Sequence, residues 1–167
     1  MGEEQQRAPD HIGRVAGCRV WRIAPTLWAR MGGLLWATWM REPWQNGKEH
    51  EAICPPRGCS NPPVKECTCG IYAFSDESGM DRPNPIGKVG GFWHVGGVIG
   101  ASGRILPAVY GFRAEKAKVM AIFNDDFPTD KEEIAHAYKV PIIDRRGYDA
   151  FCAEAGLLRL GQDGTIR

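Results

Sequence analysis

The chain lacks an excess of charge of one sign, and it lacks a long hydrophobic run. Its 167 residues include 21 Lys and Arg against 20 Asp and Glu, so neither a polybasic arm nor an acidic tail is present. The most apolar window, residues 34–40, is far shorter than the roughly 20 apolar residues that cross a bilayer. The polar residues 1–14 do not have the apolar stretch of a secretory signal. We therefore expect no membrane partner and a cytoplasmic location.

Familiar catalytic fingerprints are also missing. The glycines of residues 96–103 fit neither the Gly-x-x-x-x-Gly-Lys-Ser/Thr phosphate loop nor the Gly-x-Gly-x-x-Gly dinucleotide pattern. A nucleophile with a nearby base could be built only from His94 with Cys69 or Ser102. His94 stands in a glycine-rich apolar run, where a hydrogen-bonded structural histidine is the usual outcome. A non-catalytic protein is favoured, and an enzyme with His94 in its pocket remains an alternative.

What the chain does contain is 6 Cys, 6 Trp, 21 Gly and 12 Pro. Because Gly and Pro interrupt helices, this composition favours short strands joined by tight turns. We predict a disordered N-terminus over residues 1–14 and a single α+β domain over residues 15–167. Its sheet is expected to be mostly antiparallel, with a barrel-like closure as one form, and two short helices are expected near the C-terminus.

The local patterns place the expected elements along the chain. Helix formers at residues 113–118 allow a helix there, and residues 26–40 are open between helix and a turn followed by a strand at 35–39. A capping-box pattern and a terminal Gly156 predict helices over residues 130–138 and 146–155. Strands are predicted at 18–23, at 71–74, in the glycine-rich stretch 87–103, at 104–106, at 119–123 and at 140–143.

The strongest local signal lies in residues 52–70, a proline-rich segment with too few large aliphatic residues to form a core. It contains Cys54, Cys59, Cys67 and Cys69. Four thiolates this close in sequence can surround one zinc ion tetrahedrally, and Gly70 allows a turn whose amides could donate to the sulfurs. A site closed by four protein ligands has no open position for substrate, so this one is predicted to be structural. Loss of folding is expected when Cys67 or Cys69 becomes serine.

Other interpretations of these cysteines stay open. They could be ordinary free thiols in a loop, or His50 could replace one of them as a ligand. Disulfides are disfavoured in a reducing compartment, and a Cys67–Cys69 bond would be strained by the closeness of the two residues. Cys18 and Cys152 lie in apolar segments and are expected in the core.

The tryptophans offer a second hypothesis. Aromatic side chains can form the exposed centre of a protein-binding surface, although burial in a core is their more common role. A ligand or partner surface is predicted from the residues Trp36, Trp39, Trp44, Trp93 and His94. A nucleic-acid face is the weaker alternative, because its basic residues are accompanied by Glu115, Asp125 and Asp126. That face would consist of Arg104, Arg113, Lys116 and Lys118.

Two segments carry a resemblance to known proteins: Cys67-Thr68-Cys69-Gly70-Ile71-Tyr72-Ala73, and Gly111 to Ala117 with its Gly-aromatic-Arg-Ala-Glu pattern. Over residues 18–123 the chain resembles a group of uncharacterised proteins from actinobacteria and their phages or plasmids. The resemblance implies a small domain that a mobile element could encode, and it transfers no catalytic residue. The sequence as a whole predicts a zinc-stabilised, non-catalytic binding module with a protein partner, and a nucleic-acid-binding regulator is the alternative.

Overall fold

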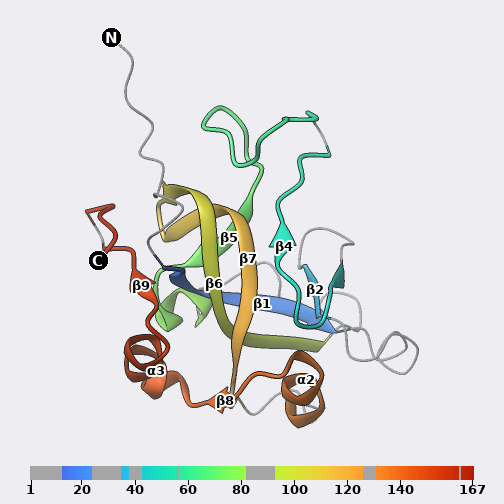
Figure 1. Cartoon of the computed structure of the whole chain (residues 1–167), viewed down its shortest axis with the longest axis vertical. Helices are drawn as coiled ribbons and strands as arrows, with labels where there is room; N and C mark the ends of the chain where they lie inside the picture. The colour runs from blue at the N-terminus through green and yellow to red at the C-terminus, as the bar shows by residue number, and fades with distance from the viewer. Residues whose placement is uncertain are drawn as a thin grey trace.

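The computed structural model of the chain describes residues 13–23, 35–37, 43–55, 57–81, 93–125, 131–161 and 163–167. Within these residues the chain is strand-rich, with two short α-helices (Figure 1). None of the described helices is long and apolar enough to cross a membrane. Expectations that concern residues 1–12, the glycines at 32 and 33, Trp39 and the first residue of the 130–138 helix fall outside the described part.

Four strands pair in a closed ring. The strand β1 (Val15–Ile23) pairs along its whole length with β6 (Trp93–Ala108), which pairs with β7 (Gly111–Phe123). The strand β7 pairs with β5 (Ile71–Phe74), and β5 returns to β1 through the pair Phe74 and Cys18. All four pairings are antiparallel, as the sequence predicts. The barrel-like form of the closure stays a prediction.

Shorter strands extend this ring. The strand β2 (Leu35–Ala37) pairs with β1 and with β3 (Pro43–Trp44), and β4 (His50–Glu51) pairs with β7. The strands β8 (Ile142–Ile143) and β9 (Leu158–Arg159) add parallel pairings to β7 and β1. Residues 35–37 are therefore strand, which answers the helix-or-strand question for the described part of residues 26–40.

A glycine of β6 permits a β-bulge of the kind that the glycine-rich pattern predicts. The register between β6 and β7 shifts between Ser102 and Ile105, and Gly103 within that shift has a φ of +74°. A residue with a side chain is strained at this φ, whereas glycine is not, so glycine permits the bulge.

The helices α2 (Lys131–Tyr138) and α3 (Tyr148–Glu154) each complete one hydrophobic cluster. Ile134, Ala135 and Tyr138 of α2 join the larger cluster with Trp21, Trp44, Phe112 and Ile122. Tyr148 and Cys152 of α3 join the smaller one, which contains Cys18 and Phe123. Figure 1 shows both helices at one end of the ring and the loop of residues 52–70 at the other.

The C-terminal expectations agree well with the structure. Helices are present where the capping-box and Gly156 patterns predict them, and Gly156 ends α3 with a φ of +65°. Cys18 and Cys152 are buried, as expected. A 3-10 turn at Arg145–Gly147 precedes α3, so the start of that helix was predicted a little early.

The option of a helix at residues 113–118 is wrong. These residues lie within β7 and pair with β5, β6 and β4. Ala114 and Ala117 are fully buried in the larger cluster. Long-range pairing and burial therefore outweigh the local helix propensity, which amounts to only a fraction of a kcal/mol per residue.

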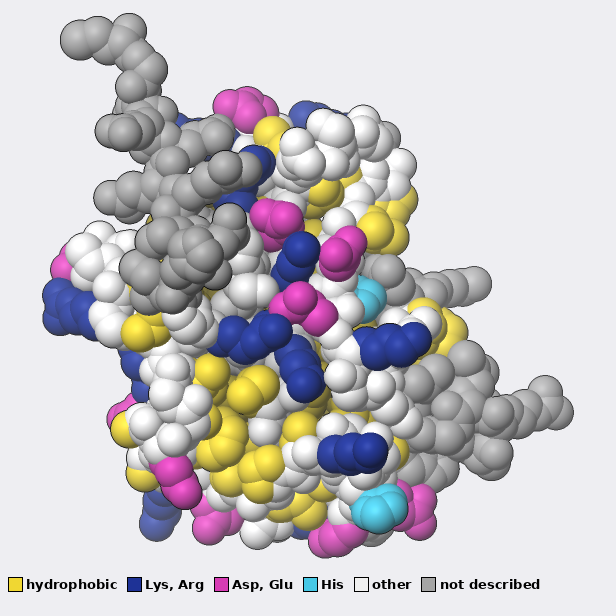
Figure 2. All heavy atoms as spheres, in the orientation of Figure 1, with side chains coloured by type: hydrophobic (Ala, Val, Ile, Leu, Met, Phe, Trp, Pro, Cys, Tyr) yellow, Lys and Arg dark blue, Asp and Glu magenta, His cyan; other side chains and the backbone are white. Residues whose placement is uncertain are grey.

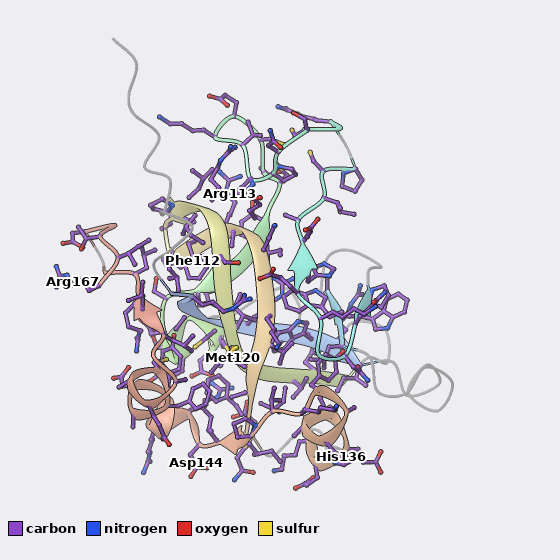
Figure 3. All side chains as sticks on the ribbon, viewed as in Figure 1. Phe112, Arg113, Met120, His136, Asp144 and Arg167 are labelled. Atoms are coloured by element: carbon purple, nitrogen blue, oxygen red, sulfur yellow. The ribbon has the colours of Figure 1, made fainter. Side chains whose placement is uncertain are left out.

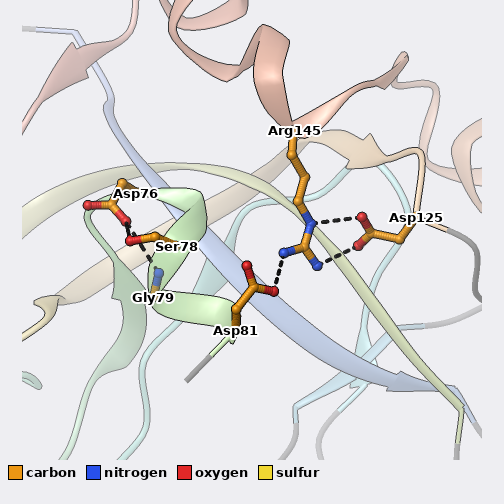
Figure 4. A network of polar contacts seen from close by, with 6 residues as sticks. All are labelled: Asp76, Ser78, Gly79, Asp81, Asp125 and Arg145. Atoms are coloured by element: carbon orange, nitrogen blue, oxygen red, sulfur yellow. Dashed lines mark hydrogen bonds and ion pairs between the residues drawn. The ribbon is translucent and has the colours of Figure 1, made fainter. Parts of the chain in front are cut away.

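An ion-pair network fixes the end of the molecule near α3 (Figure 4). Arg145 donates from Nε and Nη2 to the two carboxylate oxygens of Asp125, at 2.7 and 2.9 Å, and from Nη1 to Asp81 at 2.6 Å. Asp81 ends a 3-10 turn, Glu77–Asp81. Arg145 thus ties this turn to the end of β7.

Candidate metal centre

The cysteine loop, residues 52–70, leaves and rejoins the sheet at one point of β7. Before the loop, β4 pairs with Lys116 and Ala117, and the amide of Ala52 donates to the Glu115 carbonyl at 2.7 Å. After the loop, Ile71 pairs with Ala114. Because its two ends are attached to neighbouring residues of one strand, the loop projects from the sheet and returns to the same strand (Figure 1).

The four cysteines of the loop come together. Their sulfur atoms all lie within 4.8 Å of one another, and the structure contains no disulfide among the described cysteines. The Cys54 sulfur lies 3.3 Å from that of Cys59 and 3.5 Å from that of Cys67. Four sulfurs held about 2.3 Å from one ion in a regular tetrahedron lie about 3.8 Å apart. Cys54, Cys59, Cys67 and Cys69 are therefore close enough to hold a metal ion.

The environment of the sulfurs favours the thiolate form of Cys54 and the protonated form of Cys59 and Cys69. Hydrogen bonding by the Cys59 amide is the largest cause that lowers the pKa of Cys54, and the Cys59 thiol and the Arg57 amide add to it. The side-chain hydrogen bond with Cys54 raises the pKa of Cys59, and burial raises it further. Burial also raises the pKa of Cys69. Hydrogen bonds from neighbouring residues thus stabilise the thiolate of Cys54. A bound cation would displace the protons of the neighbouring thiols.

Amide donors to the sulfurs come from a different place than the sequence suggested. They belong to Arg57 and Cys59, between the first two cysteines, and to Val64, before the last two. Gly70 has another role. Its φ is +121°, and a Cβ added there would lie 2.8 Å from the Pro63 Cβ and 3.1 Å from the Arg113 Cβ. Glycine at this position lets the end of the loop lie against β7.

Arg113 of β7 forms hydrogen bonds with the backbone of the cysteine loop (Figure 3). Its Nη1 donates to the carbonyl oxygens of Val64 at 3.3 Å and Cys69 at 3.0 Å, and also to that of Cys67. Two of these three acceptors belong to candidate ligands. Arg113 therefore fixes the backbone that carries Cys67 and Cys69.

Arg104 of β6 acts in the same way on an earlier part of the loop. Its Nη1 donates to the carbonyl oxygens of Asn61 at 3.1 Å and Pro63 at 3.3 Å. The sequence assigned Arg104 and Arg113 to a nucleic-acid face, but both guanidinium groups bind loop carbonyls. Sequence analysis missed this role because the contacts join residues more than 40 positions apart.

One of the other two residues of that expected face pairs with an acidic side chain. Lys116 forms an ion pair with Glu51 at 3.5 Å, and Lys118 is half-buried on β7. Nearby, Arg14 pairs with Glu49 at 2.6 Å. Figure 2 shows basic and acidic side chains interleaved on this face of the molecule. The described residues of this surface form no continuous positive stripe for a phosphate backbone.

The aromatic surface expected from the sequence is only partly described, and one of its members is misplaced. Trp44 is 2% exposed, stacks on His50 and meets Trp21 edge-on, so it is a core residue and belongs to no exposed surface. Trp36 and His94 are half-buried. The backbone of Trp93 lies in β6, and its side chain is outside the described part, as is Trp39.

His94 shows no catalytic partner among the described residues. It pairs across the sheet with Arg22, and burial, followed by the Arg22 charge, lowers its pKa. Its Nε2 is buried and has no hydrogen-bond partner among the residues that the structure describes. Neither Cys69 nor Ser102 is among its described contacts: Cys69 lies in the cysteine cluster, and the Ser102 hydroxyl donates to Glu49 at 3.0 Å.

Comparison of the chain with protein-family models, with curated proteins and with solved structures finds no match.

Proposed function

We propose that this protein is a zinc-stabilised, non-catalytic binding module with a protein partner. The observation that carries the proposal is the cluster of four cysteine sulfurs within 4.8 Å of one another. A tetrahedral set of four sulfur ligands is typical of zinc or iron, and in cytosolic proteins a closed Cys₄ site of this kind commonly holds structural zinc.

Several features support a structural role for the metal. The four ligands come from one loop that has few core side chains, and two arginines from the sheet bind its carbonyl oxygens. With four protein ligands around it, the ion has no position for a water molecule or a substrate. The metal would close the loop and thereby stabilise the fold.

The metal content of protein purified without a chelator tests the proposal. We expect about one zinc per chain and a large loss of thermal stability after a strong chelator is added. Cys67→Ser and Cys69→Ser should lose zinc, whereas the matched variant Cys152→Ser, outside the cluster, should keep it. Folded protein of unchanged stability without metal would overturn the proposal. A visible absorption band from bound iron would overturn the choice of zinc.

The choice of a protein partner over nucleic acid is supported by charge. The chain is nearly neutral, and three of the four residues of the expected nucleic-acid face are engaged with the loop or with Glu51. Binding to nucleic acid through this face would fall steeply as salt is raised. We expect no such salt-dependent binding to DNA or RNA.

A further inference from the structure

Cys54 and Cys59 lie at the two ends of one tight turn. The Gly58 amide donates to the Cys54 carbonyl oxygen at 2.7 Å, and Gly58 has a φ of +59°, a conformation that glycine adopts without strain. The Cys54 sulfur lies 3.3 Å from the Cys59 sulfur, which is the shorter of its two described sulfur contacts. Since a disulfide between sulfurs this close requires only small side-chain rotations, the turn holds a pair that oxidation can join.

Cys59 is the member of this pair that is partly accessible to water. It is half-buried, whereas Cys54 is 7% exposed. The preceding residues of the turn, Arg57 and Gly58, are exposed, and a Cβ added at Gly58 would meet no described atom within 4 Å. Zinc binds cysteines as thiolates, which are the nucleophilic form of the residue. A small oxidant dissolved in water can therefore react at the Cys59 sulfur.

The other two candidate ligands are attached to the sheet. Arg113 of β7 donates to the carbonyl oxygens of Cys67 and Cys69. Oxidation of the Cys54 and Cys59 pair would leave these two as the remaining thiolates, and two ligands do not close a tetrahedral zinc site. Because Arg113 keeps their backbone in place, the four-ligand site can form again after the disulfide is reduced.

We propose that Cys54 and Cys59 form a redox-modification site, at which a hydroperoxide oxidises the pair to a disulfide and the zinc ion is released. The inference rests on the proposed function, because it starts from the zinc-bound loop. A disulfide of this kind is transient, as redox-sensing disulfides in reducing compartments are.

Hydrogen peroxide, the simplest hydroperoxide, oxidises the pair in two steps. The Cys59 thiolate attacks one oxygen, the O–O bond breaks, and the other oxygen takes up a proton and leaves as water, which gives a sulfenic acid. The Cys54 thiolate then attacks the Cys59 sulfur, the S–S bond forms, and the sulfenic hydroxyl takes up a proton and leaves as water. The two sulfurs thus supply both electrons that reduce the peroxide, and the solvent supplies both protons.

Cys54 also lines a cavity of about 810 Å³, so the modification reaches a second part of the molecule. The walls of this cavity come from the cysteine loop, β1, β5 and the turn between β6 and β7. Ile53 and Val109 line it and are 46% and 87% exposed. Because the loop is one wall, its oxidation would change the shape of an exposed apolar surface.

Titration of the zinc-bound protein with hydrogen peroxide tests this inference. We expect about one equivalent of peroxide to release the zinc, measured with a chromophoric indicator, and to consume the thiols of the pair. Mass-spectrometric mapping of non-reduced peptides should find a disulfide between Cys54 and Cys59. Cys18 and Cys152 should stay reduced, because they are 0% and 1% exposed. Dithiothreitol with added zinc should restore the starting state.

Two matched variants separate the pair from the rest of the cluster. Histidine can replace cysteine as a zinc ligand, so Cys59→His and Cys67→His should both retain zinc. Cys59→His has lost one sulfur of the pair and should release zinc under peroxide at least about tenfold more slowly. Cys67→His keeps the pair and should release zinc as the unaltered protein does. Mapping of the unaltered protein decides the outcome even if a variant fails to bind zinc.

Zinc retention by the unaltered protein, a disulfide that excludes Cys59, or release that dithiothreitol does not reverse would each overturn the inference. Equal release by the two variants would overturn it as well. Failure of the zinc site is a different result, because metal-free protein that still forms the disulfide contradicts only the zinc assignment. Zinc-bound protein that keeps its metal and its thiols under peroxide contradicts only the modification site.

Discussion

Gly70 is a residue at which the cysteine loop lies close against the sheet. It follows the last candidate ligand, adopts a φ of +121°, and leaves room for Pro63 and Arg113. An L-residue has strained backbone at this φ, and any side chain would overlap Pro63. The effect of a substitution here should therefore reach the cysteine cluster.

We predict that Gly70→Ala lowers the free energy of unfolding by about 1–3 kcal/mol and weakens zinc binding. Urea unfolding at fixed zinc, together with competition against a chromophoric chelator, measures both effects. Gly147→Ala is the control, because Gly147 has a φ of −86° and an added Cβ would meet no atom within 4 Å. Equal stability of the two variants would contradict the role assigned to Gly70.

At the scale of elements, β7 organises the candidate site. The two ends of the cysteine loop pair with its residues 114–117, and Arg113 donates to three carbonyls of that loop. The planar guanidinium can serve several acceptors at once, which the single ammonium of lysine does less well. The strand thus supports the candidate metal ligands without contributing one.

We expect Arg113→Lys to weaken zinc binding by about 10- to 100-fold, as is usual when a group that orients metal ligands is lost. Zinc affinity from chelator competition is the measurement, and Arg146→Lys on an exposed position is the matched control. Unchanged affinity in Arg113→Lys would show that the loop holds its ligands without help from β7.

At the scale of the whole molecule, the four cysteines lie outside the two hydrophobic clusters, although Ala52 at the start of the loop packs against the larger one. Neither core cluster includes any of the four cysteines, and the helices that complete those clusters lie at the opposite end of the ring (Figure 1). The metal would therefore stabilise one end of the molecule, while apolar burial stabilises the rest. Local opening of the loop should precede global unfolding.

Hydrogen exchange followed by mass spectrometry tests this division. After chelation, we expect backbone amides of residues 52–70 to exchange rapidly while those in the paired segments of β6 and β7 stay protected. Simultaneous loss of protection in both regions would show that the metal holds the whole fold. Unchanged protection of the loop would show that the metal does not hold it at all.

Much of this protein could be predicted from local patterns. The four close cysteines, the strand at residues 71–74, and the C-terminal helices with their Gly156 stop were each apparent in a short window of sequence. These features depend on residues a few positions apart, so spacing and local conformational preference suffice to find them.

Tertiary structure alone decided the rest, because the deciding contacts join distant segments. Residues 113–118 are strand because β5, β6 and β4 pair with them, and Trp44 is buried because Trp21 and His50 pack against it. The sequence by itself determined which groups could bind a metal. The closing of the sheet into a ring determined which arginines hold the loop, and which apolar side chains remain exposed around one cavity.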